Sequence, residues 1–207
     1  MGRRHGWALL ALALPVSLGT ARAGTACELP PLQDAAKPRI VYRLDETKSL
    51  VQFDAKAFLH DFAGKTSKLQ GTIRLSDPDR LTDAEACVRI DAAGLDTGNG
   101  VRDDTMRKDH LETAKYPTID FRLAQVESAR RDVGGWEFTA RGTLWLHGVS
   151  REILLRVLAR QDGEAVRLTA KLPIKMSDYQ IRIPQLLFIT IEDQVQVSFD
   201  VLARPAR

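Results

Sequence analysis

Residues 195–203 read Val-Gln-Val-Ser-Phe-Asp-Val-Leu-Ala and carry the clearest structural signal in the chain. Apolar side chains occupy every second position, and Gln196, Ser198 and Asp200 separate them. Successive side chains of a β-strand point to opposite faces, so this alternation predicts a strand with one apolar face and one polar face.

The same alternation recurs through most of the chain. It marks seven further segments, at residues 51–57, 69–75, 86–91, 119–123, 136–146, 153–159 and 166–174. Turn-forming residues separate several of them, as at residues 77–79, 134–135, 147–148 and 162–164. Long strands expose long unpaired edges unless the sheet closes on itself. The pattern therefore predicts an all-β antiparallel barrel, with a sandwich around a filled core as the alternative.

Residues 101–112 break this pattern. Val101, Met106 and Leu111 are spaced poorly for a strand. We therefore expect one short helix here, placed against the barrel wall or over one of its mouths.

The N-terminus has the features of a secretory signal peptide. Arg3 and Arg4 precede an apolar run over residues 7–18, and Ala21 and Ala23 are the small residues of a cleavage site. The run is shorter than the roughly 20 residues of a membrane-spanning helix. We expect cleavage after Ala23 and a periplasmic location, with an uncleaved membrane anchor as the alternative.

The predicted domain organisation is a signal peptide over residues 1–23, an N-terminal strap over residues 24–38 and one barrel domain over residues 39–207. The full chain has 30 basic and 27 acidic residues, and the signal peptide contains three arginines and no acid. The mature chain thus carries as many basic as acidic residues. A nucleic-acid partner would require a persistent basic surface, so we exclude nucleic acid as a partner.

The chain has two cysteines, which would enter an oxidising compartment together. Cys87 lies on the polar face of its segment beside Arg89, while Val88 points the other way, and this suits a bond to an external strap. We predict a disulfide between Cys27 and Cys87. Two free thiols, or lipid modification of Cys27, are the alternatives.

Four motifs in order resemble one known family. They are the opening strand pair at residues 42–53, Asp-Ala-Ala-Gly-Leu-Asp-Thr-Gly-Asn with Arg-Asp at residues 91–103, Leu111 with Tyr-Pro-Thr-Ile-Asp-Phe at residues 116–121, and Gly-Thr-Leu-Trp-Leu-His-Gly-Val-Ser-Arg at residues 142–151. Together they resemble the YceI-like polyisoprenoid-binding family across residues 40–204. The resemblance implies an eight-stranded antiparallel lipocalin-like barrel in the periplasm, with a hydrophobic tunnel for a polyisoprenoid or a quinone-like lipid. Residues 60–64, which replace a longer loop, and the apolar residues 180–193 depart from the family pattern.

Large apolar side chains would line such a tunnel. The ligand-binding candidates are Phe53, Phe58, Phe62, Met106, Leu111, Tyr116, Phe121, Leu144, Leu146, Tyr179, Ile181 and Phe188. Ordinary core packing is the alternative for each of them. Phe188 belongs to the apolar stretch at residues 186–189, which we expect either to lie inside the barrel or to border the tunnel mouth. We favour a mouth that meets a homodimer partner or, transiently, a membrane.

Catalytic signals are weak. No HExxH, CxxC or G-x-S-x-G motif occurs, and the adjacent residues His60 and Asp61 would point to opposite faces of a strand. We assign no catalytic residue, no metal site and no cofactor, and we expect a lipid-binding protein. The alternatives are a hydrolase or metal-dependent enzyme for an apolar substrate that uses His60, His110 and His147, and an envelope protein with a solid core.

Overall fold

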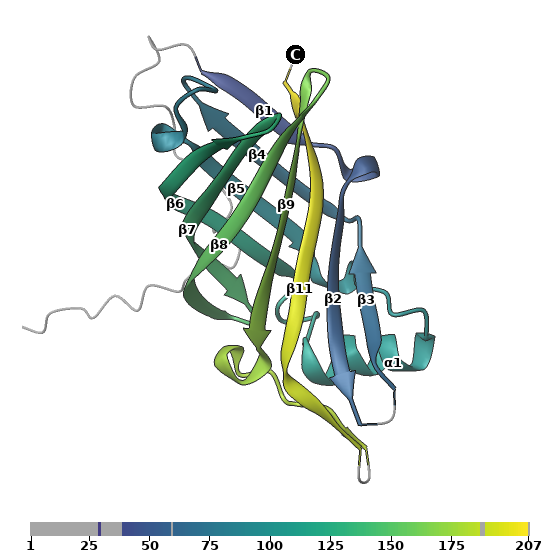
Figure 1. Ribbon diagram of the computed structural model, residues 1–207. Coiled ribbons are helices and arrows are strands. Elements are labelled where there is room, and N and C mark those ends of the chain that lie inside the picture. Colours follow the sequence, from purple (N-terminus) through teal and green to yellow (C-terminus); the bar gives the residue numbers. More distant parts are fainter. Residues whose placement is uncertain (1–28, 30–38, 59, 187–188, 207) are drawn as a thin grey trace, which may run out of the picture.

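The computed structural model describes residue 29 and residues 39–58, 60–186 and 189–206. The predicted signal peptide, nearly all of the strap, Cys27 and Phe188 lie outside these residues. Strands dominate the described chain (Figure 1). They are β1 (Ile40–Leu44), β2 (Leu50–Ala57), β3 (Phe62–Thr66), β4 (Leu69–Leu75), β5 (Glu85–Asp91), β6 (Thr118–Asp132), β7 (Gly135–Leu146), β8 (Val149–Asp162), β9 (Ala165–Lys175), β10 (Gln185–Leu186) and β11 (Ile189–Pro205).

Short helical segments connect the strands. They are η1 (Glu46–Lys48), η2 (Leu81–Asp83), η3 (Ala92–Gly94), α1 (Gly100–Thr105), η4 (Met106–His110) and η5 (Met176–Tyr179). The expected helix at residues 101–112 corresponds to α1 and η4, and the Asn99 side chain caps its first turn by accepting from the Arg102 N–H at 3.1 Å. None of the helices in the described part of the chain has the length and hydropathy of a membrane-spanning segment.

The sheet closes into a barrel. Its order is β1-β4-β5-β6-β7-β8-β9-β11, and β11 pairs back with β1, with antiparallel pairing throughout. These are the eight strands of a closed barrel, so the fold predicted from the alternation and the resemblance is confirmed. Closure leaves no long unpaired edge around this ring.

Strand β11 is long enough to pair with two strands placed end to end. Its last residues pair with β1, as Leu44 with Ala203, and its middle pairs with β2, as Leu50 with Asp200. The segment η1 lies between β1 and β2. The ladder is completed across this interruption because the Leu202 N–H donates to the buried Ser49 hydroxyl at 3.0 Å.

Strand β3 was not expected from alternation, which left residues 60–64 as a short connection. The chain instead becomes extended at Phe62, and Gly64 pairs with Phe53 of β2. A Cβ atom on Gly64 would lie 2.3 Å from the Phe53 ring, so the ring packs directly over the glycine. The strand was missed because Gly64 has no side chain that could show alternation. The space beside Gly64 is filled by the Phe53 ring of the neighbouring strand.

The β7–β8 connection is a two-residue turn at His147 and Gly148. Both residues have positive φ, 51° and 74°, and Leu146 pairs with Val149 on either side of them. A turn of this hand matches the right-handed twist of the flanking strands. It keeps β7 and β8 in register over their length, as the sequence pattern required.

Candidate functional site

The barrel encloses a cavity of about 1400 Å³. Ordinary small-molecule pockets have volumes of roughly 300–1,000 Å³, so this one is large. All eight strands of the ring, together with β2 and β3, contribute side chains to its wall. The interior of the barrel is therefore a tunnel rather than the filled core that was the alternative.

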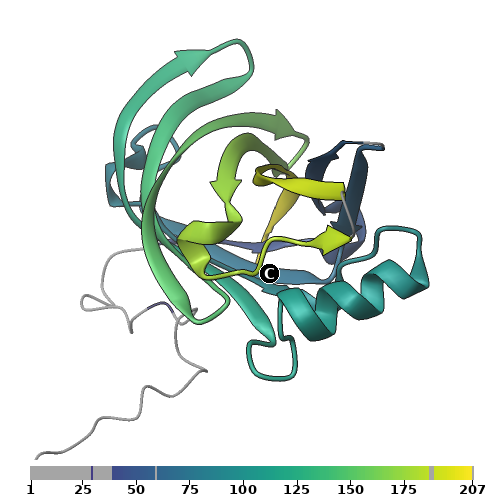
Figure 2. The same ribbon diagram turned by 90° about the horizontal axis from the view of Figure 1, so that it is seen from below.

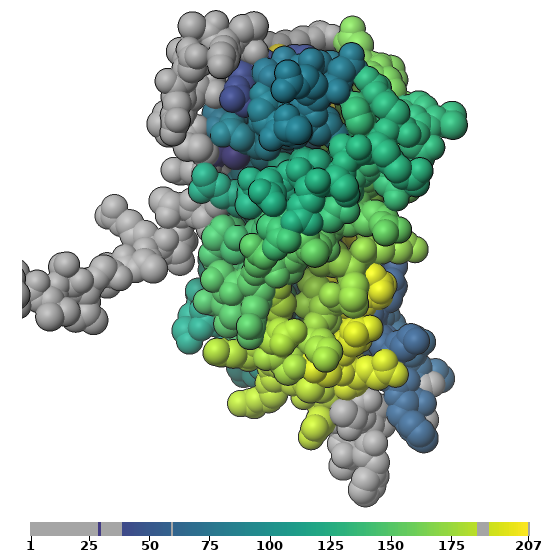
Figure 3. Space-filling model, turned by 60° about the vertical axis from the view of Figure 1, so that its left-hand side comes forward, coloured from purple at the N-terminus to yellow at the C-terminus, as the bar shows by residue number. Residues whose placement is uncertain are grey.

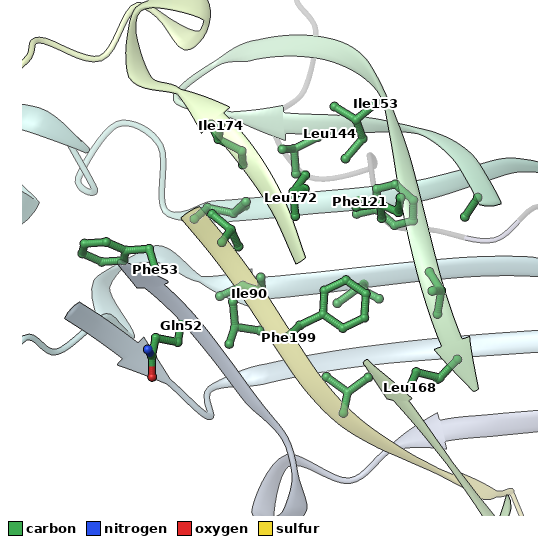
Figure 4. A pocket seen from close by; sticks show the side chains of 18 of the residues that line it. Gln52, Phe53, Ile90, Phe121, Leu144, Ile153, Leu168, Leu172, Ile174 and Phe199 are labelled. Atoms are coloured by element: carbon green, nitrogen blue, oxygen red, sulfur yellow. The ribbon is translucent and has the colours of Figure 1, made fainter. Parts of the chain in front are cut away.

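The tunnel wall is apolar because alternation turns one side chain in two inward. Figure 4 shows Phe121, Leu144, Leu172 and Phe199 pointing into the same space from different strands, whereas Gln52 points away from its neighbour Phe53. Figure 3 shows an outer face of the molecule on which the green residues of β6 to β9 take up a large part.

A second glycine makes room for an aromatic ring in the tunnel wall. A Cβ atom on Gly142 of β7 would lie 2.5 Å from the ring of Phe121, which belongs to the neighbouring strand β6. The rings of Phe121 and Phe53 therefore occupy space that a Cβ atom on the facing glycine would take.

One end of the tunnel, which we call the hairpin end, lies between the β4–β5 connection and the β6–β7 turn, at the top in Figure 1. The indole N–H of Trp136 donates to the Pro78 carbonyl at 3.1 Å. The Arg131 guanidinium lies 4.3 Å from the centre of the Trp136 ring and forms an ion pair with Asp79. These contacts join the two connections across the mouth.

A second ion pair completes the hairpin end. Arg160 donates to Asp132 at 2.6 Å. This hydrogen bond is the main reason why the pKa of Asp132 lies below its usual value, and the Val133 N–H adds to the effect. Each charge on the tunnel wall at this end therefore has an opposite charge beside it.

The other end, which we call the helix end, is bordered by α1, by the β2–β3 connection and by the segment before β10. Figure 2 looks onto this end, with α1 beside the ring of strands. Its polar wall residues are His60, Asn99, Arg102, Thr105, His110 and Gln185. The Arg102 guanidinium lies 4.4 Å from the centre of the Phe62 ring, and Phe62 meets Phe53 edge to face at 6.3 Å.

Asp103 holds the loop before α1 in place. Its buried carboxylate accepts from the Thr97 N–H at 2.9 Å and from the Thr97 hydroxyl at 2.6 Å. Burial by itself would raise the pKa of Asp103, but the hydrogen bonds from Thr97 outweigh it, and the pKa lies below its usual value. This carboxylate is therefore a structural anion at neutral pH.

Eight of the twelve predicted ligand-binding residues lie on the tunnel wall: Phe53, Phe62, Met106, Leu111, Phe121, Leu144, Leu146 and Ile181. The structure brings these eight together around one space. Whether they touch a ligand stays a prediction.

The other predicted residues are placed differently. Phe58 is 85 % exposed at the end of β2, and it is not part of the wall. Tyr116 packs on the His147 ring at 4.6 Å, and Tyr179 is buried in the core outside the tunnel. Phe188 lies outside the described residues. Tyr116 and Tyr179 both lie in connections between strands, where alternation does not indicate the direction of a side chain.

Sequence reasoning also missed wall residues that its own signal marked. Phe138 shares the parity of the candidates Leu144 and Leu146, Phe199 shares that of Val197 and Val201, and both line the tunnel. Trp136 at the start of β7 also has the parity of Phe138. Arg160 lies near the end of β8 and Arg102 lies on the helix, and no local pattern could tell that these two side chains border the same cavity.

The three histidines of the alternative enzyme hypothesis do not share a site. His60 and His110 line the helix end, whereas His147 is not on the tunnel wall. The His147 Nδ1 lies 3.0 Å from the Tyr179 carbonyl, and its Nε2 lies 2.7 Å from a Glu112 carboxylate oxygen. Both ring nitrogens are thus engaged in holding the turn. Within the described residues, no three His, Cys, Asp or Glu side chains are grouped so that they could hold a metal ion.

A closed antiparallel barrel around an apolar tunnel defines a small-ligand-binding β-barrel. The chain belongs to the YceI-like domain family, whose match covers residues 42–203. The predicted family is confirmed.

Solved structures share this fold. The chain is similar to Burkholderia cenocepacia BcnA, with a TM-score of 0.67 and 23 % identity over 77 % of this chain and 98 % of that one. It is similar to a polyisoprenoid binding domain from Saccharophagus degradans implicated in plant cell wall breakdown, with a TM-score of 0.60 and 24 % identity over 80 % and 98 % of the two chains. For the Campylobacter jejuni YCEI protein the TM-score is 0.58, with 22 % identity over 70 % and 85 %. No curated protein matches the chain.

Proposed function

We propose that the protein binds one long apolar lipid, of the polyisoprenoid or quinone type, inside the barrel. The observation that carries this proposal is the tunnel of about 1400 Å³ with an apolar wall contributed by every strand of the ring. Membership of the YceI-like family and the likeness to a polyisoprenoid binding domain support a lipid-binding barrel.

Water is a poor occupant of this space. At about 30 Å³ per molecule, the volume would hold roughly 45 waters, and each ordered water needs two to four polar partners. The charged wall residues among those described are Asp79, Arg102, Arg131, Asp132 and Arg160, and all of them lie at the ends. An apolar chain fits the middle of the tunnel, where each buried CH₂ contributes about 0.8 kcal/mol.

Lipid occupancy can be tested on the purified mature protein. Organic extraction followed by mass spectrometry should recover about one lipid with a long apolar chain per protein molecule. A protein that carries no lipid, takes up none from micelles and turns over ester substrates would instead support the hydrolase alternative.

We further propose that the protein is exported and that Cys27 and Cys87 form a disulfide that ties the strap to the barrel. The proposal is supported by the burial of Cys87, which is 2 % exposed although its strand neighbour Val88 points into the tunnel. An outward side chain this well buried requires a cover, and the predicted strap contains the other cysteine of the chain. The mass of the protein from a periplasmic fraction should correspond to a chain that begins near Gly24, and two alkylatable thiols without reductant would refute the disulfide.

A transient membrane contact at the helix end would give an apolar lipid a route into the tunnel. Two large apolar side chains are exposed there, Phe58 at 85 % and Val101 at 81 %, and Val101 also lines the tunnel. We expect Phe58→Asp to reduce co-sedimentation with phospholipid vesicles. The matched control is Val133→Asp at the hairpin end, where Val133 is 89 % exposed. Equal effects of the two substitutions would contradict a contact at the helix end. The homodimer stays a prediction that light scattering can check.

A further inference from the structure

The charges on the tunnel wall are distributed unequally between its ends. Among the described wall residues, four charges lie at the hairpin end and form the pairs Arg131–Asp79 and Arg160–Asp132. The remaining charge, Arg102, lies alone at the helix end. The helix end is therefore the place where the tunnel wall offers a positive charge without a carboxylate on the same wall.

The Arg102 side chain is held by neutral groups. Its Nε donates to the Thr97 hydroxyl at 2.8 Å, and its Nη2 donates to the Thr97 carbonyl at 3.0 Å. The nearby carboxylate of Asp103 receives its hydrogen bonds from Thr97, and no described acid lies within ion-pair distance of Arg102. These bonds fix the guanidinium in position, and no described residue accepts a hydrogen bond from its third nitrogen, Nη1.

The apolar wall leads directly to this guanidinium. Phe53 and Phe62 form an edge-to-face pair, and Arg102 lies over the Phe62 ring at 4.4 Å. A chain lying along the two rings would end beside a cation that is already desolvated on one face. An ion pair or charge-assisted hydrogen bond at such a position is stronger than one in open water.

Three of the other polar groups at the helix end are engaged. Asn99 caps α1, the Thr105 hydroxyl donates to the Val101 carbonyl at 3.0 Å, and His110 Nδ1 donates to the Arg182 carbonyl at 2.7 Å. The side chains of His60 and Gln185 can also donate to a ligand. Arg102 is the only guanidinium among the described wall residues of this end.

We propose that the head of the bound lipid lies at the helix end against Arg102, and that this head is an oxyanion, either a phosphate or a carboxylate. This inference rests on the proposed lipid binding and narrows its ligand class. A guanidinium donates in a planar fork that matches both oxyanions. An uncharged alcohol head would leave the charge of Arg102 without a partner.

The test compares lipids that share a tail and differ in the head. Geranylgeranyl phosphate and geranylgeraniol form one pair, and palmitate and hexadecanol form the other. Binding is measured by displacement of a fluorescent apolar probe from the full mature chain. We expect the wild-type protein to bind at least one anionic lipid roughly 10- to 100-fold more tightly than its alcohol, which is the usual range for a charge-assisted hydrogen bond. The pair with the larger ratio tells whether the site prefers phosphate or carboxylate.

Two variants assign this preference to one end. Arg102→Gln should bring the anion-to-alcohol ratio close to one, and Arg102→Lys should retain part of it, since a point charge remains but the fork is lost. Arg160→Gln at the hairpin end is the matched control and should keep the wild-type ratio. A structural role of Arg102 alone would weaken both lipids equally and leave the ratio unchanged.

The outcomes separate this inference from the proposed function. An anion-to-alcohol affinity ratio near one in the wild-type protein overturns the inference. This outcome does not depend on whether any variant folds. A ratio that falls in Arg160→Gln rather than in Arg102→Gln overturns the placement of the head. Failure of all four lipids to bind would overturn lipid binding itself.

Discussion

The two ends of the tunnel are built from the same kinds of residues but in opposite arrangements. At the hairpin end, Arg131 and Arg160 each have a carboxylate partner, and Trp136 ties the two connections together. At the helix end, Arg102 has neutral partners, and Phe58 lies exposed nearby. The difference shows that a charged residue on a cavity wall indicates a ligand site only when its own hydrogen-bond and ion-pair partners are known. Paired charges stabilise a closed mouth, whereas a cation without a carboxylate partner marks a place for a ligand.

The largest effect is expected from blocking the tunnel between the two ends. Ala140 of β7 is 3 % exposed and faces the cavity, and Ala140→Trp would place an indole where lipid methylenes should lie. Displacing two CH₂ groups already costs about 1.6 kcal/mol, so lipid occupancy should fall by about tenfold or more. Mass spectrometry of extracted lipid measures the occupancy.

Thr139→Trp is the matched control for this substitution. Thr139 is the preceding residue of the same strand and is not part of the tunnel wall, so its side chain points away from the cavity. The control protein should keep its lipid. Equal loss of lipid from both variants would mean that the lipid does not pass Ala140 inside the tunnel. The two ends would then not belong to one continuous binding space.

A smaller effect is expected from opening the hairpin end. Trp136→Ala removes the hydrogen bond to Pro78, the stacking on Arg131 and part of the apolar wall. Because Trp136 is half-buried, the loss of unfolding free energy should be roughly 2–3 kcal/mol, below the ~3–5 kcal/mol of a fully buried tryptophan. Chemical denaturation measures it.

Trp136→Phe should recover most of this stability, since the ring remains and only the N–H donor is lost. The preference for anionic over alcohol lipids should stay at the wild-type value in both variants. A changed preference would mean that the hairpin end also contacts the lipid head, and the contrast between the ends would fail.

The smallest effect is a pH dependence that differs between the ends. Hydrogen bonds from Thr97 hold the pKa of Asp103 below its ordinary value of 3.8. A lowered folded-state pKa contributes stability that is present above the unfolded pKa and is lost as the pH falls through the folded pKa. Asp103→Asn should therefore cost about 1–2 kcal/mol at neutral pH. The difference in unfolding free energy between this variant and the wild-type protein should disappear as the pH falls below about 4.

Asp132→Asn is the comparison at the hairpin end. The pKa of Asp132 is also lowered, mainly by its hydrogen bond with Arg160, but water screens this more exposed pair. We expect the same sign of pH dependence with a smaller amplitude. Denaturation curves from about pH 2 to pH 7 would test both variants, and a gap for Asp103→Asn that stays constant with pH would contradict the role of its charge.

Much of the architecture could be predicted from the sequence. Alternation located seven of the eight ring strands in part or in full, as in residues 195–203 of β11, and the break at residues 101–112 located the helix. The eighth, β1, was indicated only by the family motif at residues 42–53. Alternation could not find β3, because Gly64 carries no side chain to show parity and is placed by the Phe53 ring of another strand.

Within each alternating segment, the sequence by itself determined which side chains face inward, since this depends only on the direction of successive residues along one strand. It also determined the family, through motifs that are local in the chain. Only the tertiary structure decided that Arg102 and Arg160 lie at opposite ends of one tunnel. It also decided that Asp79 and Asp132 pair with wall arginines, whereas no described acid pairs with Arg102. Closure of the barrel brings these residues together through pairing between distant strands, such as β11 with β1, and a residue pattern with a period of two carries no information about such distant pairs.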